Sequence, residues 1–398
     1  MASTRLTRRK LHLVMLLLLA LLTISCGNAS TQAVPEQATS TPLQSLRSLA
    51  QARGMYIGTV VNVDALQSEE QYGEVLAREF NIVTPEVSLK FDATEPELNQ
   101  YNFDRGDTIV AFAKAHNMQV RGHTLVWYRA LPSWLTAGKF SRSELMQILR
   151  DHIFTEVSHY HGQITIWDVV NEAVNNDGTL QDSIWLRGIG PDYIDWAFRW
   201  AHEANPQARL FYNDFGGEGS SRKSDAIYNL VRGLLQRGVP ISGVGLQMHV
   251  GIDSYPDPQD VLANMQRLNA LGLEVQITEM DVRIQGDRRP VQTRLSIQAQ
   301  IYRDMLSVCL EVAGCTAFVM WGFTDLHSWI PSATGHPDAP LIFDQDYRPK
   351  PAYFALMDDL EQRRMSHREK RPLHLLRYGS SPRSCRNCFR PTQLQQRP

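Results

Sequence analysis

Two glutamates stand near the ends of apolar segments that otherwise suit buried strands. Glu172 closes the segment Ile164–Glu172 (ITIWDVVNE), and Glu279 lies in Glu274–Val282 (EVQITEMDV). Hydrolysis of a glycosidic bond uses such a pair, because one carboxylic acid protonates the leaving oxygen while a second carboxylate attacks the anomeric carbon. Other apolar segments also lead to side chains that can titrate, stack on a sugar ring or bind its hydroxyl groups: Glu86, Lys90, His123, Trp127, Asn171, Asn213, Gln247, His249, Asp281, Trp321 and Trp329.

Each of these residues alone has a simpler structural interpretation. A glutamate at a strand end is often a cap or half of an ion pair, a single tryptophan or histidine usually belongs to the core, and Lys90 could be a solvated loop charge. The recurrence of such side chains at the same end of several segments favours a shared site. A metal-dependent hydrolase fits less well, since His123 and His249 stand singly on different segments. A glycan-binding barrel without catalysis would be expected to lose a carboxylate, and both glutamates are present.

Eight short apolar segments, most of them followed by a helical stretch, would carry these side chains. The expected strands are Met55–Asn62, Ile82–Val87, Gln119–Trp127, Ile164–Glu172, Arg209–Phe215, Gly243–Val250, Glu274–Val282 and Thr316–Thr324. Helical periodicity is seen, for example, in Arg105–His116, Ser141–Tyr160, Lys223–Gln236 and Val291–Leu310. Eight such units within residues 51–360 predict a single α/β domain, a (β/α)₈ TIM barrel. A doubly wound sheet is the alternative, but no glycine-rich phosphate loop follows the first strand, and we expect no cofactor.

A barrel would bring the polar side chains together. Its active site lies at the carboxyl ends of the strands, where the loops begin. Strands four and seven face each other across the barrel, so Glu172 and Glu279 could reach the roughly 5–5.5 Å separation of a retaining glycosidase. Tryptophans would suit the apolar faces of sugar rings, and amide side chains would suit their hydroxyl groups.

The N-terminal segment is typical of an exported bacterial protein. Basic residues precede the apolar stretch Leu13–Ile24, and Thr23–Cys26 resembles a lipobox, so residues 1–26 are predicted to be a signal peptide with Cys26 as the lipidation site. An ordinary secretory signal is the alternative, and Arg8-Arg9 could instead belong to a twin-arginine signal. We expect a polar linker over residues 27–50, a location outside the cytoplasm, and no membrane contact beyond this anchor.

The rest of the composition says little about partners. The formal net charge of the 398 residues is -2, which gives no electrostatic argument for nucleic acid binding, and we expect a monomer. Residues 361–398 hold ten Lys/Arg and two Asp/Glu, and such a segment is expected to be disordered. Cys385 and Cys388 in this tail lack a second ligand pair and give only a weak zinc signal.

Longer motifs resemble one known family. The stretches WDVVNEAVNNDGTLQDSIW and VQITEMDVRI are similar to the acid/base and nucleophile signatures of glycoside hydrolase family 10, and RGHTLVW, GVGLQMHV, WGFTDLHSWIP and PLIFDQDYRPKPAY match as well. The resemblance covers Ala52 to Leu360. It implies a (β/α)₈ barrel and, most often in this family, an endo-β-1,4-xylanase acting on xylan. The same chemistry on another β-linked glycan, such as mixed-linkage glucan or an aryl cellobioside, is the alternative.

The resemblance assigns roles to the residues at the reaction centre. Glu172 would be the acid/base and Glu279 the nucleophile. Asn171 would hydrogen-bond the 2-hydroxyl of the attacked sugar. Trp321 and Trp329 would cover the sugar at the reaction centre.

It also assigns supporting roles around the two glutamates. His249 would orient the nucleophile, with Asp281 holding His249, and Gln247 would lie near the acid/base. Lys90 and His123 would contact the sugar on the non-reducing side of the cleavage point. Members of the family often bridge a pair of cysteines like Cys309 and Cys315, and an exported protein permits a disulfide; two buried thiols are the alternative.

The chain departs from the family on the wall that binds the second sugar of the non-reducing side. Where the family usually has Glu-Asn-x-Met-Lys-Trp, this chain has Glu86–Phe91 (EVSLKF), so Val87 replaces an asparagine, and Phe91 would keep an aromatic platform. After LVW, the usual His-Ser/Asn-Gln is Tyr128–Ala130 (YRA). After YND, the family often has an aromatic-Asn pair, whereas this chain has Phe215–Gly217 (FGG).

These departures predict a weaker or differently selective second subsite. Val87 and Ala130 stand where the family has amide side chains that bind sugar hydroxyl groups. Arg129 could recruit an acidic branch of the polymer, such as a glucuronic acid. The alternative is that Arg129 points into solvent, as exposed arginines commonly do.

Overall fold

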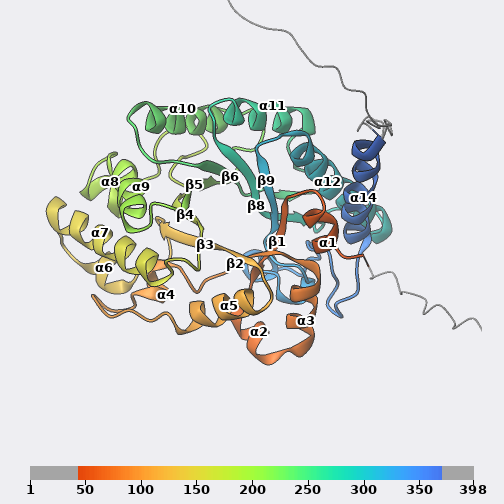
Figure 1. The fold of residues 1–398 in the computed structure, drawn as a ribbon, viewed down its shortest axis with the longest axis horizontal. Helices are drawn as coiled ribbons and strands as arrows, with labels where there is room; N and C mark the ends of the chain where they lie inside the picture. Colours follow the sequence, from red (N-terminus) through yellow and green to blue (C-terminus); the bar gives the residue numbers. More distant parts are fainter. Residues whose placement is uncertain (1–43, 370–398) are drawn as a thin grey trace, which may run out of the picture. The chain divides into compact units, whose positions relative to one another are not determined.

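Residues 44–369 are described by the computed structural model, with side chains to residue 362. Their strands form one closed parallel barrel surrounded by helices (Figure 1). Neighbours in the sheet follow the order β6-β5-β4-β3-β2-β1-β9-β8, and pairing of β6 with β8 closes the ring. The strands are β1 (Tyr56–Val61), β2 (Ile82–Pro85), β3 (Gln119–Val126), β4 (Ile166–Asn171), β5 (Arg209–Asp214), β6 (Gly243–Leu246), β7 (His249–Gly251), β8 (Glu274–Arg283) and β9 (Cys315–Met320). The predicted (β/α)₈ barrel is confirmed.

All the strands differ from their predicted ranges by at least one residue, and two of them differ most. The sixth, expected over Gly243–Val250, is interrupted between β6 and β7 because Met248 has a φ of 65°, which breaks the ladder. The Met248 N–H donates instead to Oε1 of Glu218 at 3.0 Å. The last strand, expected to reach Thr324, ends at Met320, and Gly322 turns the chain away with a φ of 107°.

Helices cover the outside of the barrel. The four helical segments named from periodicity all form helices, and each of their boundaries lies within one residue of the prediction. The helices are α1 (Leu46–Gln51), α2 (Val63–Ser68), α3 (Glu70–Glu79), α4 (Phe91–Thr94), α5 (Asp104–Ala115), α6 (Ser133–Ala137), α7 (Arg142–His159), α8 (Ile184–Gly188), α9 (Tyr193–Ala204), α10 (Arg222–Gln236), α11 (Pro258–Asn269), α12 (Val291–Glu311), the short 3₁₀ helix η1 (Asp325–His327), α13 (Ile330–Thr334) and α14 (Pro351–Glu369).

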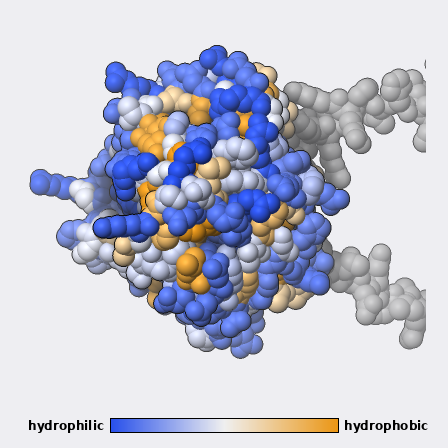
Figure 2. Space-filling model, turned by 90° about the vertical axis from the view of Figure 1, so that its left-hand side faces the viewer, coloured by the Kyte–Doolittle hydropathy of each residue, from blue (hydrophilic) through white to orange (hydrophobic). Residues whose placement is uncertain are grey.

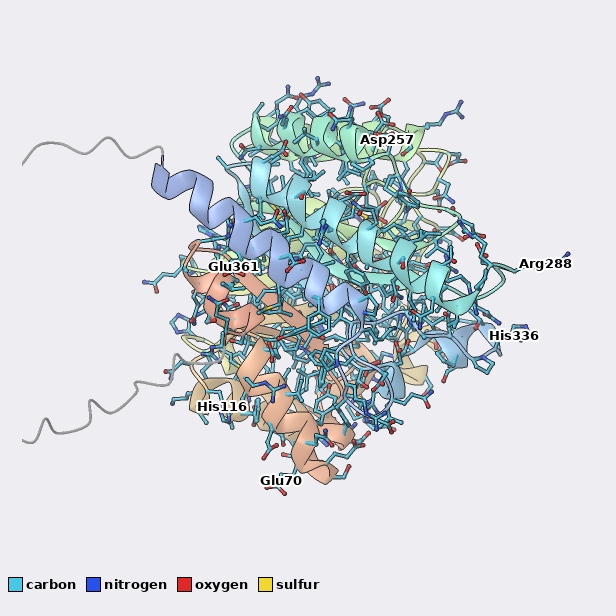
Figure 3. The ribbon with its side chains drawn as sticks, turned by 90° about the vertical axis from the view of Figure 1, so that its right-hand side faces the viewer. Glu70, His116, Asp257, Arg288, His336 and Glu361 are labelled. Carbon is cyan, nitrogen blue, oxygen red and sulfur yellow. A yellow bond between two sulfur atoms is a disulfide. The ribbon has the colours of Figure 1, made fainter. Side chains whose placement is uncertain are left out.

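The two ends of the described chain are more ordered than composition alone indicated. Helix α1 occupies the end of the segment predicted to be a polar linker over residues 27–50, because Leu46, Leu49 and Ala50 recur at helical spacing and are buried. Helix α14 continues past residue 360, into the range predicted as a disordered tail, and packs beside α12 (Figure 3). The signal peptide, Cys26, and the Cys385/Cys388 pair lie outside the described residues.

The core has two parts because side chains on a strand alternate between its faces. A small cluster inside the barrel consists of Ile82, Ile166, Phe211, Ala317 and Val319. A much larger cluster fills the layer between the strands and the helices. The surface is mostly hydrophilic with scattered apolar patches on the face shown in Figure 2.

A disulfide joins Cys309 of α12 to Cys315 at the start of β9, as the family resemblance led us to expect. The two cysteines are six positions apart, so the bond closes the short turn that leads into the last strand. Of the helices described, none is both long and apolar enough to span a bilayer.

Candidate active site

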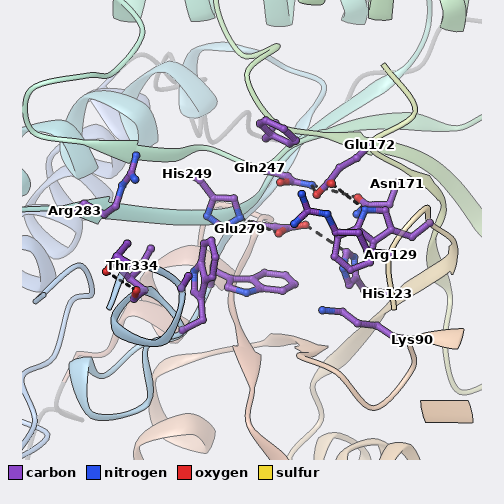
Figure 4. Close-up of a pocket in the computed structure, with 16 residues that line it drawn as sticks. Lys90, His123, Arg129, Asn171, Glu172, Gln247, His249, Glu279, Arg283 and Thr334 are labelled. Carbon is purple, nitrogen blue, oxygen red and sulfur yellow. Dashed lines mark hydrogen bonds and ion pairs between the residues drawn. The ribbon is translucent and has the colours of Figure 1, made fainter. Parts of the chain in front are cut away.

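A cavity of about 380 Å³ opens at the carboxyl ends of the strands (Figure 4). Ten of the residues singled out from sequence line it: Lys90, His123, Trp127, Asn171, Glu172, Gln247, His249, Glu279, Trp321 and Trp329. Asn213 and Asp281 lie just behind the lining, each hydrogen-bonded to a residue that faces the cavity. Glu86 follows β2, where burial raises the pKa of its carboxyl despite the nearby Lys90 charge.

Glu172 directly follows β4, and hydrogen bonds hold both of its carboxylate oxygens and its backbone N–H. Its Oε2 accepts from Nε1 of Trp127 at 2.8 Å, and its Oε1 accepts from Nε2 of Gln247 at 3.1 Å. Its backbone N–H donates to the carbonyl of Asn213 at 2.8 Å. The φ of Glu172 is 56°, in the left-handed region that residues with a Cβ atom rarely adopt. Such backbone strain often accompanies a functional position.

Glu279 lies in β8 and is almost fully buried, with 4% of its surface exposed. Asn213 Nδ2 donates to its Oε1 at 2.6 Å, and His249 Nε2 lies 3.1 Å from its Oε2. Burial alone would raise the pKa of Glu279, but the hydrogen bond from His249 and the electrostatic effects of His123 and His249 outweigh it, so this pKa lies below the usual carboxyl value. The geometry therefore favours an ionised Glu279, as a nucleophile requires.

His249 connects Glu279 to a second carboxylate. Its Nδ1 lies 2.9 Å from Oδ2 of Asp281, which also accepts from Nε1 of Trp329 at 2.8 Å. Burial lowers the pKa of His249, but the charge of Asp281 and the hydrogen bonds to Asp281 and Glu279 raise it to about 10. His249 is therefore an imidazolium at neutral pH and donates from both ring nitrogens.

Amide side chains link the two glutamates across the cavity floor. Oδ1 of Asn171 accepts from Nδ2 of Asn213 at 2.9 Å and from Nε2 of Gln247 at 3.2 Å. Turning the Asn171 amide over would let its nitrogen donate to the Asn213 carbonyl at 3.2 Å, but that nitrogen would then face the two other amide nitrogens at 2.9 and 3.2 Å. The first orientation gives both neighbouring amide donors an acceptor, and it leaves Nδ2 of Asn171 as its remaining donor.

A buried charged layer beneath the site was not anticipated from sequence. Arg121 forms an ion pair with Asp168 and also donates to Gln276, with all three side chains inside the barrel. His123 Nδ1 lies 3.0 Å from Oδ2 of Asp168. Burial raises the pKa of Asp168, but Arg121 and His123 more than offset it, so the net pKa is lowered. The sequence did contain a signal for this layer, because Arg121 and Asp168 are charged residues within otherwise apolar strands. Arg121 lies two residues before His123, and Asp168 lies four residues before Glu172.

Aromatic rings and a lysine form the wall around the glutamates. Nζ of Lys90 lies 5.0 Å from the ring centre of Trp127 and 5.9 Å from that of Trp321. The ring of His123 packs edge-on against Trp321 with centroids 5.2 Å apart. Burial lowers the pKa of Lys90, partly offset by the charges of Glu279 and Glu86.

The residues that depart from the family pattern occupy different places. Arg129 and Phe215 line the cavity, whereas Val87 is 45% exposed on the rim outside the lining. Phe91 was expected to remain a sugar platform; this is wrong, because Phe91 is buried and stacks on His152 with ring centres 3.6 Å apart. Ala130 has a φ of 50°, and its carbonyl accepts the N–H of Asp92 at 3.0 Å.

Arg129 is exposed and also lines the cavity (Figure 4). Its guanidinium carbon lies 5.1 Å from the ring centre of Tyr128. Arg283, at the end of β8, also lines the cavity and was not singled out from the sequence. Over residues 44–369, no group of three or more His, Cys, Asp or Glu side chains is arranged to hold a metal ion.

Comparison with known proteins agrees with this fold. The model of glycosyl hydrolase family 10 matches residues 45–359. Endo-1,4-beta-xylanase B of Thermotoga neapolitana is 44% identical over 322 residues, which span 80% of this chain and 92% of that protein. Native xylanase 10B from Thermotoga maritima superposes with a TM-score of 0.79 at 42% identity, covering 81% of this chain and 100% of the other.

A second solved structure, xylanase 10B from Thermotoga petrophila RKU-1 in complex with xylobiose, gives a TM-score of 0.78 at 43% identity and covers 81% of this chain and 98% of that one. The family match extends over most of the sequence and includes every strand of the barrel. The chain therefore belongs to glycosyl hydrolase family 10.

Proposed function

We propose that this protein is a retaining endo-β-1,4-xylanase in which Glu172 is the acid/base and Glu279 the nucleophile. The observation that carries the proposal is that both carboxylates line one cavity at the carboxyl end of the barrel, each held by two donors. Their environments differ in the way the two roles require. Glu279 is buried beside an imidazolium, and Glu172 is held by the neutral donors Trp127 and Gln247.

The proposed reaction has two displacements. First, a carboxylate oxygen of Glu279 forms a bond to the anomeric carbon while the bond to the leaving oxygen breaks, and Glu172 transfers its proton to that oxygen. Next, Glu172 accepts a proton from water, the water oxygen bonds to the anomeric carbon, and the bond to Glu279 breaks. His249 would stabilise Glu279 each time its negative charge returns.

Xylan is the substrate that the comparisons favour. Most of the relatives and structural neighbours that cover most of this chain are named as endo-1,4-β-xylanases or xylanases, and one was solved with xylobiose. One relative, from Acetivibrio thermocellus, is named Exoglucanase XynX and is 38% identical over 315 residues. The tryptophans of the wall offer apolar faces to sugar rings, and the remaining donor of Asn171 suits a sugar hydroxyl. Another β-linked glycan would use the same reacting groups.

Export from a bacterial cytoplasm is also part of the proposal. The Cys309–Cys315 disulfide supports it, since such bonds persist mainly in oxidising compartments. Anchoring through a lipid on Cys26 remains a prediction from the N-terminal sequence.

A product profile tests the substrate assignment. Purified protein is incubated with xylan, mixed-linkage glucan and cellulose, and the products are separated over time. We expect xylan to be cleaved with the early appearance of a range of xylo-oligosaccharides, and Glu279→Gln to be inactive on it. Faster cleavage of glucan than of xylan, or release of a single short product from the start, would contradict an endo-acting xylanase.

A further inference from the structure

The backbone around Glu172 is held by the neighbouring strand at two consecutive positions. Glu172 adopts a left-handed φ of 56°, which persists only where the surroundings enforce it. Its N–H donates to the carbonyl of Asn213 at 2.8 Å. The next N–H, that of Ala173, donates to the phenol oxygen of Tyr212 at 3.1 Å. One of the two restraints on this backbone therefore depends on a side chain.

Tyr212 lies on the outer face of β5, away from the cavity. Phe211 packs inside the barrel and Asn213 reaches Glu279, so the alternation of the strand turns Tyr212 and Asp214 toward the helices. The Tyr212 hydroxyl is buried and donates to Oδ2 of Asp214. Because its proton is directed to Asp214, the phenol oxygen is free to accept from Ala173.

Asp214 is itself fixed by a lysine from α10. Nζ of Lys223 lies 2.8 Å from Oδ1 of Asp214, and the two side chains are 2% and 0% exposed. The backbone N–H of Phe215 donates to the same carboxylate oxygen at 2.9 Å. A buried ion pair often contributes no more stability than a well-packed apolar pair would. Its position directly behind the backbone of Glu172 therefore suggests a role other than stability.

We propose that Lys223, Asp214 and Tyr212 are positioning residues for Glu172. Lys223 fixes Asp214, Asp214 orients the Tyr212 hydroxyl, and that hydroxyl holds the Ala173 N–H, so that the left-handed turn presents the Glu172 carboxyl to the leaving oxygen. None of the three lines the cavity that holds the two glutamates. The inference rests on the proposed function, in which Glu172 is the proton donor.

Leaving-group dependence tests the proposal directly. The substrates are a 2,4-dinitrophenyl and a phenyl β-xylobioside, because the first leaving group needs no proton and the second does. A general acid contributes about 10²–10⁴-fold, and small displacements remove much of such an effect. For Tyr212→Phe we expect kcat/KM on the phenyl substrate to fall roughly tenfold or more, with the dinitrophenyl value within about twofold of the parent.

The ratio of the two kcat/KM values is the decisive readout. Both values are measured on one enzyme preparation, so a smaller fraction of folded enzyme lowers both equally and cancels in their ratio. A variant that is merely less well folded therefore leaves the ratio unchanged. Tyr72→Phe is a matched control, since its buried phenol oxygen also accepts one backbone N–H, from Asn62 at 3.0 Å, far from Glu172 in the chain. We expect no change of ratio in this control and a change in Lys223→Met in the same direction as in Tyr212→Phe.

Glu172→Ala separates this inference from the proposed function. It should show a larger loss on the phenyl substrate than any of the positioning variants. If it shows that loss while Tyr212→Phe lowers both substrates equally or neither, the positioning role is wrong and the catalytic assignment stands. If Glu172→Ala shows no preference for the better leaving group, Glu172 is not the acid, and both proposals fall.

Discussion

Replacing His249 by glutamine should move the acidic side of the pH profile upward. At neutral pH His249 is charged, because its pKa is raised to about 10, and its Nε2 lies 3.1 Å from Oε2 of Glu279. Glutamine keeps a neutral donor at this place and removes the charge. Glu279 then retains the effect of burial, which raises its pKa, keeps a neutral hydrogen bond at Oε2, and loses the charge of His249, which is one of the effects that lower its pKa.

The size of the change follows from the hydrogen bond that is altered. A bond to a charged group contributes ~1.5–3 kcal/mol and a neutral one ~0.5–1.5 kcal/mol, so the charge accounts for about 1–1.5 kcal/mol. Since one pH unit in a titration midpoint corresponds to ~1.4 kcal/mol, the acid limb of kcat/KM should move up by about one pH unit. The sign follows because Glu279 must be ionised to attack, and a raised pKa protonates it at higher pH.

The assay is kcat/KM on an aryl β-xylobioside across the acid range, which reports groups of the free enzyme. His336→Gln is the matched control, because His336 is exposed outside the cavity, and its profile should coincide with that of the parent. An acid limb that stays in place or moves down in His249→Gln would refute the claim that His249 stabilises ionised Glu279.

Three further predictions concern the glycone wall, charge recognition and location. Val87→Asn with Ala130→Gln should strengthen cleavage of linear xylo-oligosaccharides roughly tenfold to a hundredfold, as two hydrogen bonds of ~0.5–1.5 kcal/mol each are restored; unchanged kinetics would count against a weakened subsite. Arg129→Gln should lower kcat/KM on oligosaccharides that bear a glucuronic acid and leave kcat/KM on neutral ones unchanged. Salt at roughly 0.5 M should reduce this difference, because it screens exposed charges. Equal effects on both kinds of oligosaccharide would reject charge recognition. Cys26→Ser should move the protein out of the membrane fraction, and identical retention of both forms would rule out the lipid anchor.

The fold could be predicted because its strands are short apolar segments that end in polar residues. Ile166, Phe211 and Val319 fill the interior, and the residues that follow them along the strands reach the cavity. This pattern can be recognised from neighbouring residues in the sequence, and few architectures other than a barrel are compatible with it. The break in the sixth strand could not be predicted, because it depends on the φ of Met248 and on a hydrogen bond from the Met248 N–H to Glu218, which lies in a different loop.

The predictable part of the site consists mostly of side chains that face the cavity, together with Asn213 and Asp281 directly behind it. Phe91 adjoins Lys90 in sequence, yet it turns inward to stack on His152, and nothing in its neighbours reveals that partner. The ion pair between Lys223 and Asp214 could not be predicted from the sequence either, because Lys223 belongs to a helix and Asp214 to the end of a strand. Helical spacing in Leu46–Ala50 was a usable signal that the polar composition around it obscured.

The most direct test of a two-glutamate retaining enzyme is proton NMR of the first products formed from a xylo-oligosaccharide, recorded before the anomers equilibrate. Glu279 as nucleophile implies two inversions at the anomeric carbon and hence net retention. We therefore predict that the newly formed reducing end appears first as the β-anomer and that the α-anomer grows in only by mutarotation. The initial appearance of the α-anomer would contradict the mechanism.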